Sequence, residues 1–159
     1  MTAIKNLHHA AYRCRDSEET RKFYEDFLGL ELTNALVIPK THTGREANVL
    51  HTFFAMHDGS CLAFFEEPDE AFDFKPQRDF DLHIALEVTH ETLLEMFEKG
   101  KAAGMEPRGI SDHGFVDSIY FRDPNGYVIE LAAPKTPAGD AESIDAHAIL
   151  GEWQQGKQQ

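Results

Sequence analysis

The clearest pattern of apolar and polar positions lies near the end of the chain, between residues 116 and 132. A segment of mixed apolar and polar residues at 116–122 and an apolar run at 127–132 flank the sequence Asp-Pro-Asn-Gly at 123–126. Proline presets φ and Asn-Gly accepts positive φ, so this tetrapeptide predicts a turn between two paired strands. The apolar run carries one carboxylate, Glu130. A lone acid in an apolar strand must be solvated at an edge, paired, or bound to a cation.

Apolar runs bounded by turn residues predict further strands in both halves of the chain. These strands are expected at 7–14, 31–38, 49–56, 60–65, 81–88 and 105–109. Residues 66–80 contain two prolines and several acids without a clear period, so we expect a linker that lies across the surface. Residues 111–114 are expected to form a loop.

Helix-start signals predict two helices in the body of the chain and one in its tail. Asp16 and the acids that follow it have the spacing of a capping box, which predicts a helix to about residue 28. Thr89 or His90 is expected to cap a second helix over 92–103. A third helix, over 141–154, is expected to bury four apolar side chains. They are Ile144, Ile149, Leu150 and Trp153.

The order strand, helix, three strands occurs twice, and the repeat is visible in the residues themselves. Leu-His-Ile-Ala at 82–85 lies 74 positions after His-His-Ala-Ala at 8–11. The fold class is therefore α+β, with two βαβββ modules at 5–66 and 81–133. They form a domain over 1–135, followed by a tail at 136–159. Two such curled mixed sheets can close on each other and leave a central cleft.

Composition restricts the classes of partner. Fifteen basic and twenty-eight acidic residues give a net charge of −13, which disfavours nucleic acid and anionic membranes as partners. No apolar run reaches membrane-spanning length, and the first six residues lack a signal-peptide core. Cys14 and Cys61 lie in separate predicted strands and are expected to be reduced and small apolar core residues. These observations predict a cytoplasmic protein.

The repeat brings three possible metal ligands to comparable places. His9 and His83 lie on the first strand of each half, and Glu130 lies on the last strand of the second half. The fourth place by symmetry is Ala63, which cannot bind a metal. Two imidazoles and one carboxylate can occupy one face of a metal ion and leave the other face open, as in non-haem iron(II) sites. A single strand histidine is more often structural, so the hypothesis depends on the repeat.

These residues resemble the vicinal oxygen chelate superfamily, which includes glyoxalase I, extradiol dioxygenases, methylmalonyl-CoA epimerase and the fosfomycin and bleomycin resistance proteins. The resemblance covers about residues 5–133 and rests on the segments at 7–16, 82–88 and 123–131. It implies paired βαβββ modules and metal ligands at His9, His83 and Glu130. Glyoxalase I and the epimerase typically have a carboxylate where this chain has Ala63, which argues against both.

The resemblance also implies roles for Tyr120 and His113, because extradiol dioxygenases have a tyrosine at this distance before the glutamate and a histidine in a similar loop. Tyr120 would hydrogen-bond a substrate hydroxyl, and His113 would help to bind or orient the substrate. The strand register decides whether this is feasible. If Arg122 pairs with residue 127, Tyr120 faces away from Glu130, whereas a shift of one residue puts both on one face.

The resemblance implies a metal-dependent enzyme, and we expect an iron(II) dioxygenase that cleaves a catechol-like diol. The first alternative is a lyase, isomerase or transferase in the glyoxalase or fosfomycin-resistance style, which would use manganese, nickel or zinc without redox change. The second is a drug-binding module with no metal. The family habit and the apolar tail suggest a homodimer.

Overall fold

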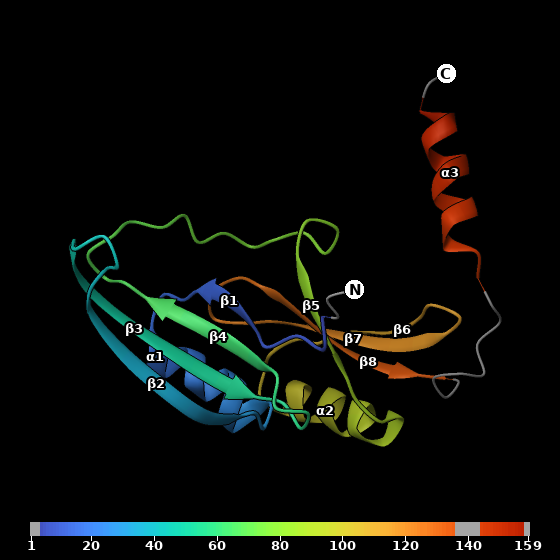
Figure 1. Cartoon of the computed structure of the whole chain (residues 1–159). Coiled ribbons are helices and arrows are strands. Elements are labelled where there is room, and N and C mark those ends of the chain that lie inside the picture. The colour runs from blue at the N-terminus through green and yellow to red at the C-terminus, as the bar shows by residue number, and fades with distance from the viewer. Residues whose placement is uncertain (1–3, 136–143, 158–159) are drawn as a thin grey trace.

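Two four-stranded mixed sheets carry the repeat, in a computed structural model that describes residues 4–135 and 144–157. Sheet A has the order β1-β4-β3-β2 and sheet B the order β5-β8-β7-β6 (Figure 1). Sheet A consists of β1 (His9–Arg13), β2 (Glu31–Lys40), β3 (Glu46–Ala55) and β4 (Cys61–Glu66). Sheet B consists of β5 (His83–Glu87), β6 (Arg108–Asp112), β7 (Val116–Arg122) and β8 (Val128–Pro134). The first and last strands of each module pair in parallel, so the predicted α+β fold of two βαβββ modules is confirmed.

The first two helices begin next to cap residues that the sequence predicted. Asp16 caps α1 (Ser17–Arg21) by accepting a hydrogen bond from the Glu19 amide at 2.8 Å, and the helix continues as the π-helical segment η1 (Lys22–Phe27). Thr89, rather than His90, caps α2 (His90–Ala102). A capping oxygen satisfies one of the amides that have no partner in the first helical turn.

The core lies between the sheets and the helices that cover one face of each. α1 packs on β4 of sheet A, and α2 packs on β7 and β8 of sheet B. Phe27 of η1 meets Phe121 of β7 edge to face, with ring centroids 5.2 Å apart, so the two modules share one core. No helix of the described residues covers the opposite faces of the two sheets.

Side chains of the turn at 123–126 form hydrogen bonds that connect the two modules. The Asn125 carboxamide accepts a hydrogen bond from the Arg15 amide at 2.8 Å, and its Nδ2 donates to the Thr20 hydroxyl at 3.3 Å. The fully buried Tyr24 hydroxyl donates to the Asp123 carboxylate at 3.0 Å. A sequence that predicts a hairpin turn therefore also supplies the polar contacts between the two halves.

The strand register places the two halves in correspondence. His9 pairs with Cys61 and Ala63 lies two residues further along β4, whereas His83 pairs with Val128 and Glu130 lies two residues further along β8. Ala63 therefore occupies in sheet A the place of Glu130 in sheet B, as the sequence repeat predicted.

Two expectations about local structure are wrong. The sixth strand covers Arg108–Asp112 instead of 105–109, because Glu106 has φ of 49° and the chain is still turning there. This strand also takes up part of the loop expected at 111–114.

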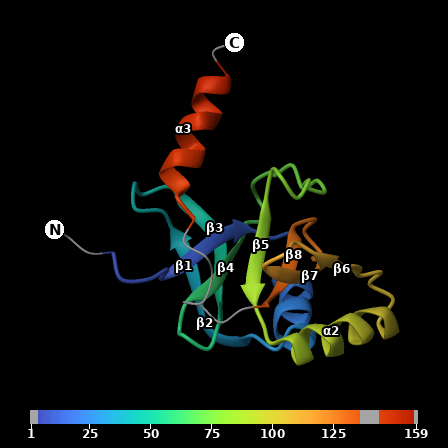
Figure 2. The ribbon, with the colours of Figure 1, turned by 90° about the vertical axis from the view of Figure 1, so that its right-hand side faces the viewer.

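The tail helix forms as α3 (Ala146–Gly156), but it does not bury the predicted apolar side chains. It stands apart from both sheets (Figures 1 and 2). Ile144, Ile149, Leu150 and Trp153 are exposed by 73%, 58%, 54% and 65%. Part of the predicted tail, 136–143, lies outside the described residues, as do residues 1–3. None of the helices in the described part of the chain has the length and apolarity to cross a membrane.

Candidate metal-binding and catalytic site

Glu130 is the centre of a polar cluster on the helix-free face of sheet B. Arg122 pairs with Val128, which puts Tyr120 directly opposite Glu130 and on the same face. Of the two registers that the sequence left open, this is the one that allows the pair to act together. The Tyr120 hydroxyl lies 3.3 Å from Glu130 Oε1, and the buried Ser118 hydroxyl donates to the same oxygen at 2.5 Å. Both contacts use Oε1, which leaves Oε2 for another partner.

His83 presents a ring nitrogen to that other oxygen. Its Nδ1 lies 2.7 Å from the Asp79 carbonyl oxygen, and because a carbonyl can only accept, Nδ1 carries the proton. Nε2 lies 3.3 Å from Glu130 Oε2. In the neutral tautomer, Nε2 and Oε2 are both acceptors, so a proton or a metal cation is needed between them. A hydrogen bond from the second ring nitrogen to a carbonyl is also the usual way in which a metal-ligating histidine is oriented.

Tyr120 and His113 form the polar edge of this cluster. His113 Nε2 lies 2.9 Å from the Tyr120 hydroxyl, so the sequence-predicted pair is brought together. Burial, with a smaller contribution from the negative charge of Glu130, raises the pKa of the Tyr120 hydroxyl. Tyr120 is therefore a hydrogen-bond donor at neutral pH, and the exposed His113 ring connects it to solvent.

His9 lies elsewhere, on the exposed face of sheet A. Its Nδ1 is 2.7 Å from Nδ1 of His8, and its ring packs against Phe53 with centroids 5.5 Å apart. Within residues 4–135 and 144–157, no group of three or more His, Cys, Asp or Glu side chains is arranged to hold one ion. A single chain thus brings together His83 and Glu130, with Tyr120 and His113, and leaves His9 apart.

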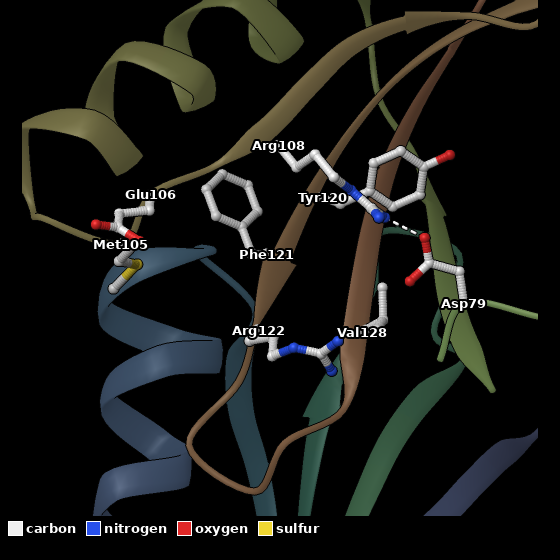
Figure 3. Close-up of a pocket in the computed structure, with 8 residues that line it drawn as sticks. All are labelled: Asp79, Met105, Glu106, Arg108, Tyr120, Phe121, Arg122 and Val128. Atoms are coloured by element: carbon white, nitrogen blue, oxygen red, sulfur yellow. Dashed lines mark hydrogen bonds and ion pairs between the residues drawn. The ribbon is translucent and has the colours of Figure 1, made fainter. Parts of the chain in front are cut away.

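A cavity of about 350 Å³ adjoins the cluster (Figure 3). Tyr120, Arg122 and Val128 line it from the sheet, and Arg108 and Asp79 close it from the side. Arg108 forms an ion pair with Asp79, and its guanidinium carbon lies 4.5 Å from the centre of the Tyr120 ring. The cavity therefore shares Tyr120 with the Glu130 cluster.

The sequence argument missed three residues of this site: Ser118, Asp79 and Arg108. A signal for Ser118 was present, because Ser118, Tyr120 and Arg122 are alternate polar positions of a strand whose intervening residues include Ile119 and Phe121. Asp79 acts through its backbone carbonyl, which no sequence pattern reveals. Arg108 could not be placed, because the start of its strand was predicted three residues too early.

The chain matches the family model described as Glyoxalase/Bleomycin resistance protein/Dioxygenase superfamily over residues 6–131. A comparison with curated proteins found no match. Among solved structures, a glyoxalase/dioxygenase from Nostoc punctiforme is 24% identical, with a TM-score of 0.62 over 83% of this chain and 92% of that one.

Two further structures share this fold. The fosfomycin resistance protein FosX from Listeria monocytogenes, complexed with Mn(II) and sulfate, is 23% identical, with a TM-score of 0.62 over 84% of this chain and 95% of that one. TnmS3, an antibiotic binding protein from Streptomyces sp. CB03234, is 16% identical, with a TM-score of 0.62 over 85% of this chain and 100% of that one. At these identities the likeness concerns the fold.

Proposed function

The chain belongs to the Glyoxalase/Bleomycin resistance protein/Dioxygenase superfamily, and from this premise we propose that it is a divalent-metal-dependent enzyme acting on a small molecule. The reaction that we propose is the ring cleavage of a catechol-like diol with iron(II). The observation that carries the metal site is the pair of acceptors 3.3 Å apart, His83 Nε2 and Glu130 Oε2, with the other histidine nitrogen already used by a carbonyl. Imidazole and carboxylate together suit iron(II), manganese(II), nickel(II) and zinc(II).

A second copy of the chain would supply the third ligand, His9. Within one chain the modules meet where η1 contacts Phe121 and Lys99 and at the 123–126 turn, and the helix-free faces of the two sheets lie away from these contacts. The His83 side chain is 42% exposed, and His9 is exposed as well. In a two-fold symmetric dimer, sheet A of one copy can face sheet B of the other, which makes two equal sites. This arrangement also explains why His9 and His83 are both exposed in the single chain.

The residues around Glu130 have roles that follow from their contacts. Ser118 and Tyr120 hold Oε1, so Glu130 would bind a metal through Oε2. A bound divalent ion supplies Lewis acidity, which lowers the pKa of a coordinated substrate hydroxyl. Tyr120 stays protonated, and on substrate binding its single hydroxyl proton would turn from Glu130 Oε1 to a substrate oxygen, while His113 Nε2, 2.9 Å away, would orient the hydroxyl. Tyr120 lies ten residues before Glu130 in the sequence, the distance that extradiol dioxygenases have. This spacing favours the ring-cleaving reaction over the alternatives.

Metal content and oxygen uptake test the reaction. Protein purified without air is expected to bind iron(II), and its mixture with a panel of catechols and air should consume oxygen and form a coloured ring-opened product. Tyr120→Phe is expected to lower kcat by about 10²–10³-fold, the usual cost of removing one hydrogen-bond donor to a reacting oxygen. Turnover with manganese(II) and no oxygen uptake would reject the dioxygenase reading in favour of a fosfomycin-resistance-like or glyoxalase-like reaction.

A mixing experiment tests the shared site. His9→Ala and Glu130→Ala dimers should each be inactive, but random exchange of their subunits should restore about a quarter of wild-type activity. Half of the dimers would then be mixed, and each mixed dimer has one intact site of two. Mixing two preparations of the same variant is the control. If the mixed sample stays inactive although subunit exchange is verified by mass spectrometry, the shared-site proposal is wrong.

A further inference from the structure

The cavity beside Tyr120 lies on the same face of sheet B as the candidate metal ligands. Tyr120 and Val128 both line the cavity; Tyr120 pairs with Glu130, and Val128 pairs with His83. A group bound in the cavity would therefore be separated from the metal position by one residue along β7 and β8. A volume of about 350 Å³ is at the lower end of the range for ligand pockets, which indicates a small ligand or one part of a larger one.

Two guanidinium groups line this cavity in a chain whose net charge is −13. Arg122 donates to the Gly126 carbonyl at 2.9 Å and has no carboxylate within ion-pair distance in the described part of the chain. Arg108 is paired with Asp79 and is 60% exposed. Figure 3 shows that the two guanidinium groups reach in from different strands, toward the region in front of Val128. The other carboxylate of the lining is Glu106, at the opposite end of the cavity.

From these contacts we propose that the cavity binds the anionic group of the substrate, a carboxylate or a phosphonate, between Arg122 and Arg108. Both groups present two or more oxygens, which a guanidinium binds through paired hydrogen bonds. The inference deepens the proposed function, since the reacting end of the same substrate would lie at His83 and Glu130. Asp79 competes with the anion for Arg108. While the cavity is empty, the Asp79 carboxylate therefore neutralises the Arg108 guanidinium.

Arg108 has a possible structural role that the experiment must separate from anion binding. It could serve only to hold Asp79, whose carbonyl oxygen orients His83. Removal of Arg108 would then weaken metal binding, whereas removal of Arg122 would change neither anion binding nor metal binding. If the arginines bind the anion, removal of either one should lower the affinity for charged ligands and leave the affinity for metal unchanged.

Calorimetric titration of the full-length protein with matched probes tests the proposal. The carboxylate probe is 3,4-dihydroxyphenylacetate against its methyl ester, and the phosphonate probe is propylphosphonate against 1-propanol. At low salt the charged member of at least one pair is expected to bind about tenfold or more tightly, which corresponds to about 1.4 kcal/mol. The pair that shows the preference identifies which anion the site accepts.

Three variants and a control make the test specific. Arg122→Gln and Arg108→Gln are expected to remove most of the charge preference while manganese(II) binding stays unchanged. Asp79→Asn keeps the backbone carbonyl and removes the competing carboxylate, so it should tighten the charged probe. Arg45→Gln is the matched control, because Arg45 is an exposed guanidinium in the connection between β2 and β3 that is likewise paired with carboxylates.

Several results would overturn the inference. They are no charge preference in the wild type for either pair, a preference that survives both arginine variants, or an equal loss in the Arg45→Gln control. A loss of manganese(II) binding in Arg108→Gln, with Arg122→Gln unaffected, would assign Arg108 the structural role. A charge preference in protein that binds no divalent metal would instead support the anion site and contradict the proposed function, so the two failures are distinguishable.

Discussion

Replacement of Asn125 by alanine should strongly destabilise the protein, because this side chain links the two modules. Asn125 is only 2% exposed, and its carboxamide makes three hydrogen bonds, to the Arg15 amide, the Thr20 hydroxyl and the Asp123 carboxylate. A neutral hydrogen bond contributes about 1 kcal/mol and one to a charged group about 1.5–3 kcal/mol. The sum for Asn125→Ala is about 3–5 kcal/mol, a large share of the roughly 5–15 kcal/mol that stabilises a typical domain.

Urea unfolding followed by circular dichroism measures this loss. With a slope near 2 kcal/mol/M, the midpoint should fall by about 1.5–2.5 M without a change in slope. Asn48→Ala is the matched control, since Asn48 is exposed and makes no side-chain hydrogen bond in the described part of the chain; it should cost less than about 0.5 kcal/mol. A midpoint for Asn125→Ala no lower than that of the control would refute the linking role.

Asn125→Asp separates shape from charge at the same position. It keeps the size of the side chain but places a second carboxylate within hydrogen-bond distance of Asp123, whose pKa is already raised by burial. Two carboxylates this close favour a shared proton, so the variant should be destabilised at neutral pH and recover part of its stability as the pH falls. Equal stability at acid and neutral pH would contradict this account.

Three further predictions concern packing, the metal site and pH. In Gly100→Ala the new Cβ would lie 2.4 Å from the buried Phe121 ring, so a cost of about 1–3 kcal/mol should outweigh the helix-propensity gain of about 1 kcal/mol, and a rise in the urea midpoint would count against this packing. Ser118→Ala frees Glu130 Oε1 and should weaken manganese(II) binding by about 10–100-fold in a calorimetric titration, whereas unchanged affinity would exclude Ser118 as a positioning residue. Burial raises the pKa of all four tyrosines, to about 12 for Tyr127. The neutral phenol is thus favoured in the folded state, so stability should be retained below about pH 10 and decrease as the pH rises through the raised values; tyrosinate absorbance appearing near pH 10 in the native protein, as in urea, would contradict the burial.

Local sequence determined the elements and their order. Cap residues such as Asp16 and Thr89 started the helices, and the Asp-Pro-Asn-Gly turn joined two strands, because these effects act over a few residues. The repeat between the halves placed Ala63 in the position of Glu130, since two similar modules adopt the same register. The fold followed from these local and periodic signals, whereas the roles of Tyr120 and His113 were implied by the family resemblance.

Tertiary structure decided what depends on distant segments. The β7–β8 register put Tyr120 and Glu130 on one face, and the sequence alone allowed either register. The 123–126 turn became the contact between the modules because its buried side chains found Arg15, Thr20 and Tyr24, about a hundred residues away. The modules joined through their helices, so sheet A and sheet B kept their ligand-bearing faces apart, and His9 did not meet Glu130. A pattern of residues specifies which side chains a strand presents, whereas only the packing of the modules determines which of them meet.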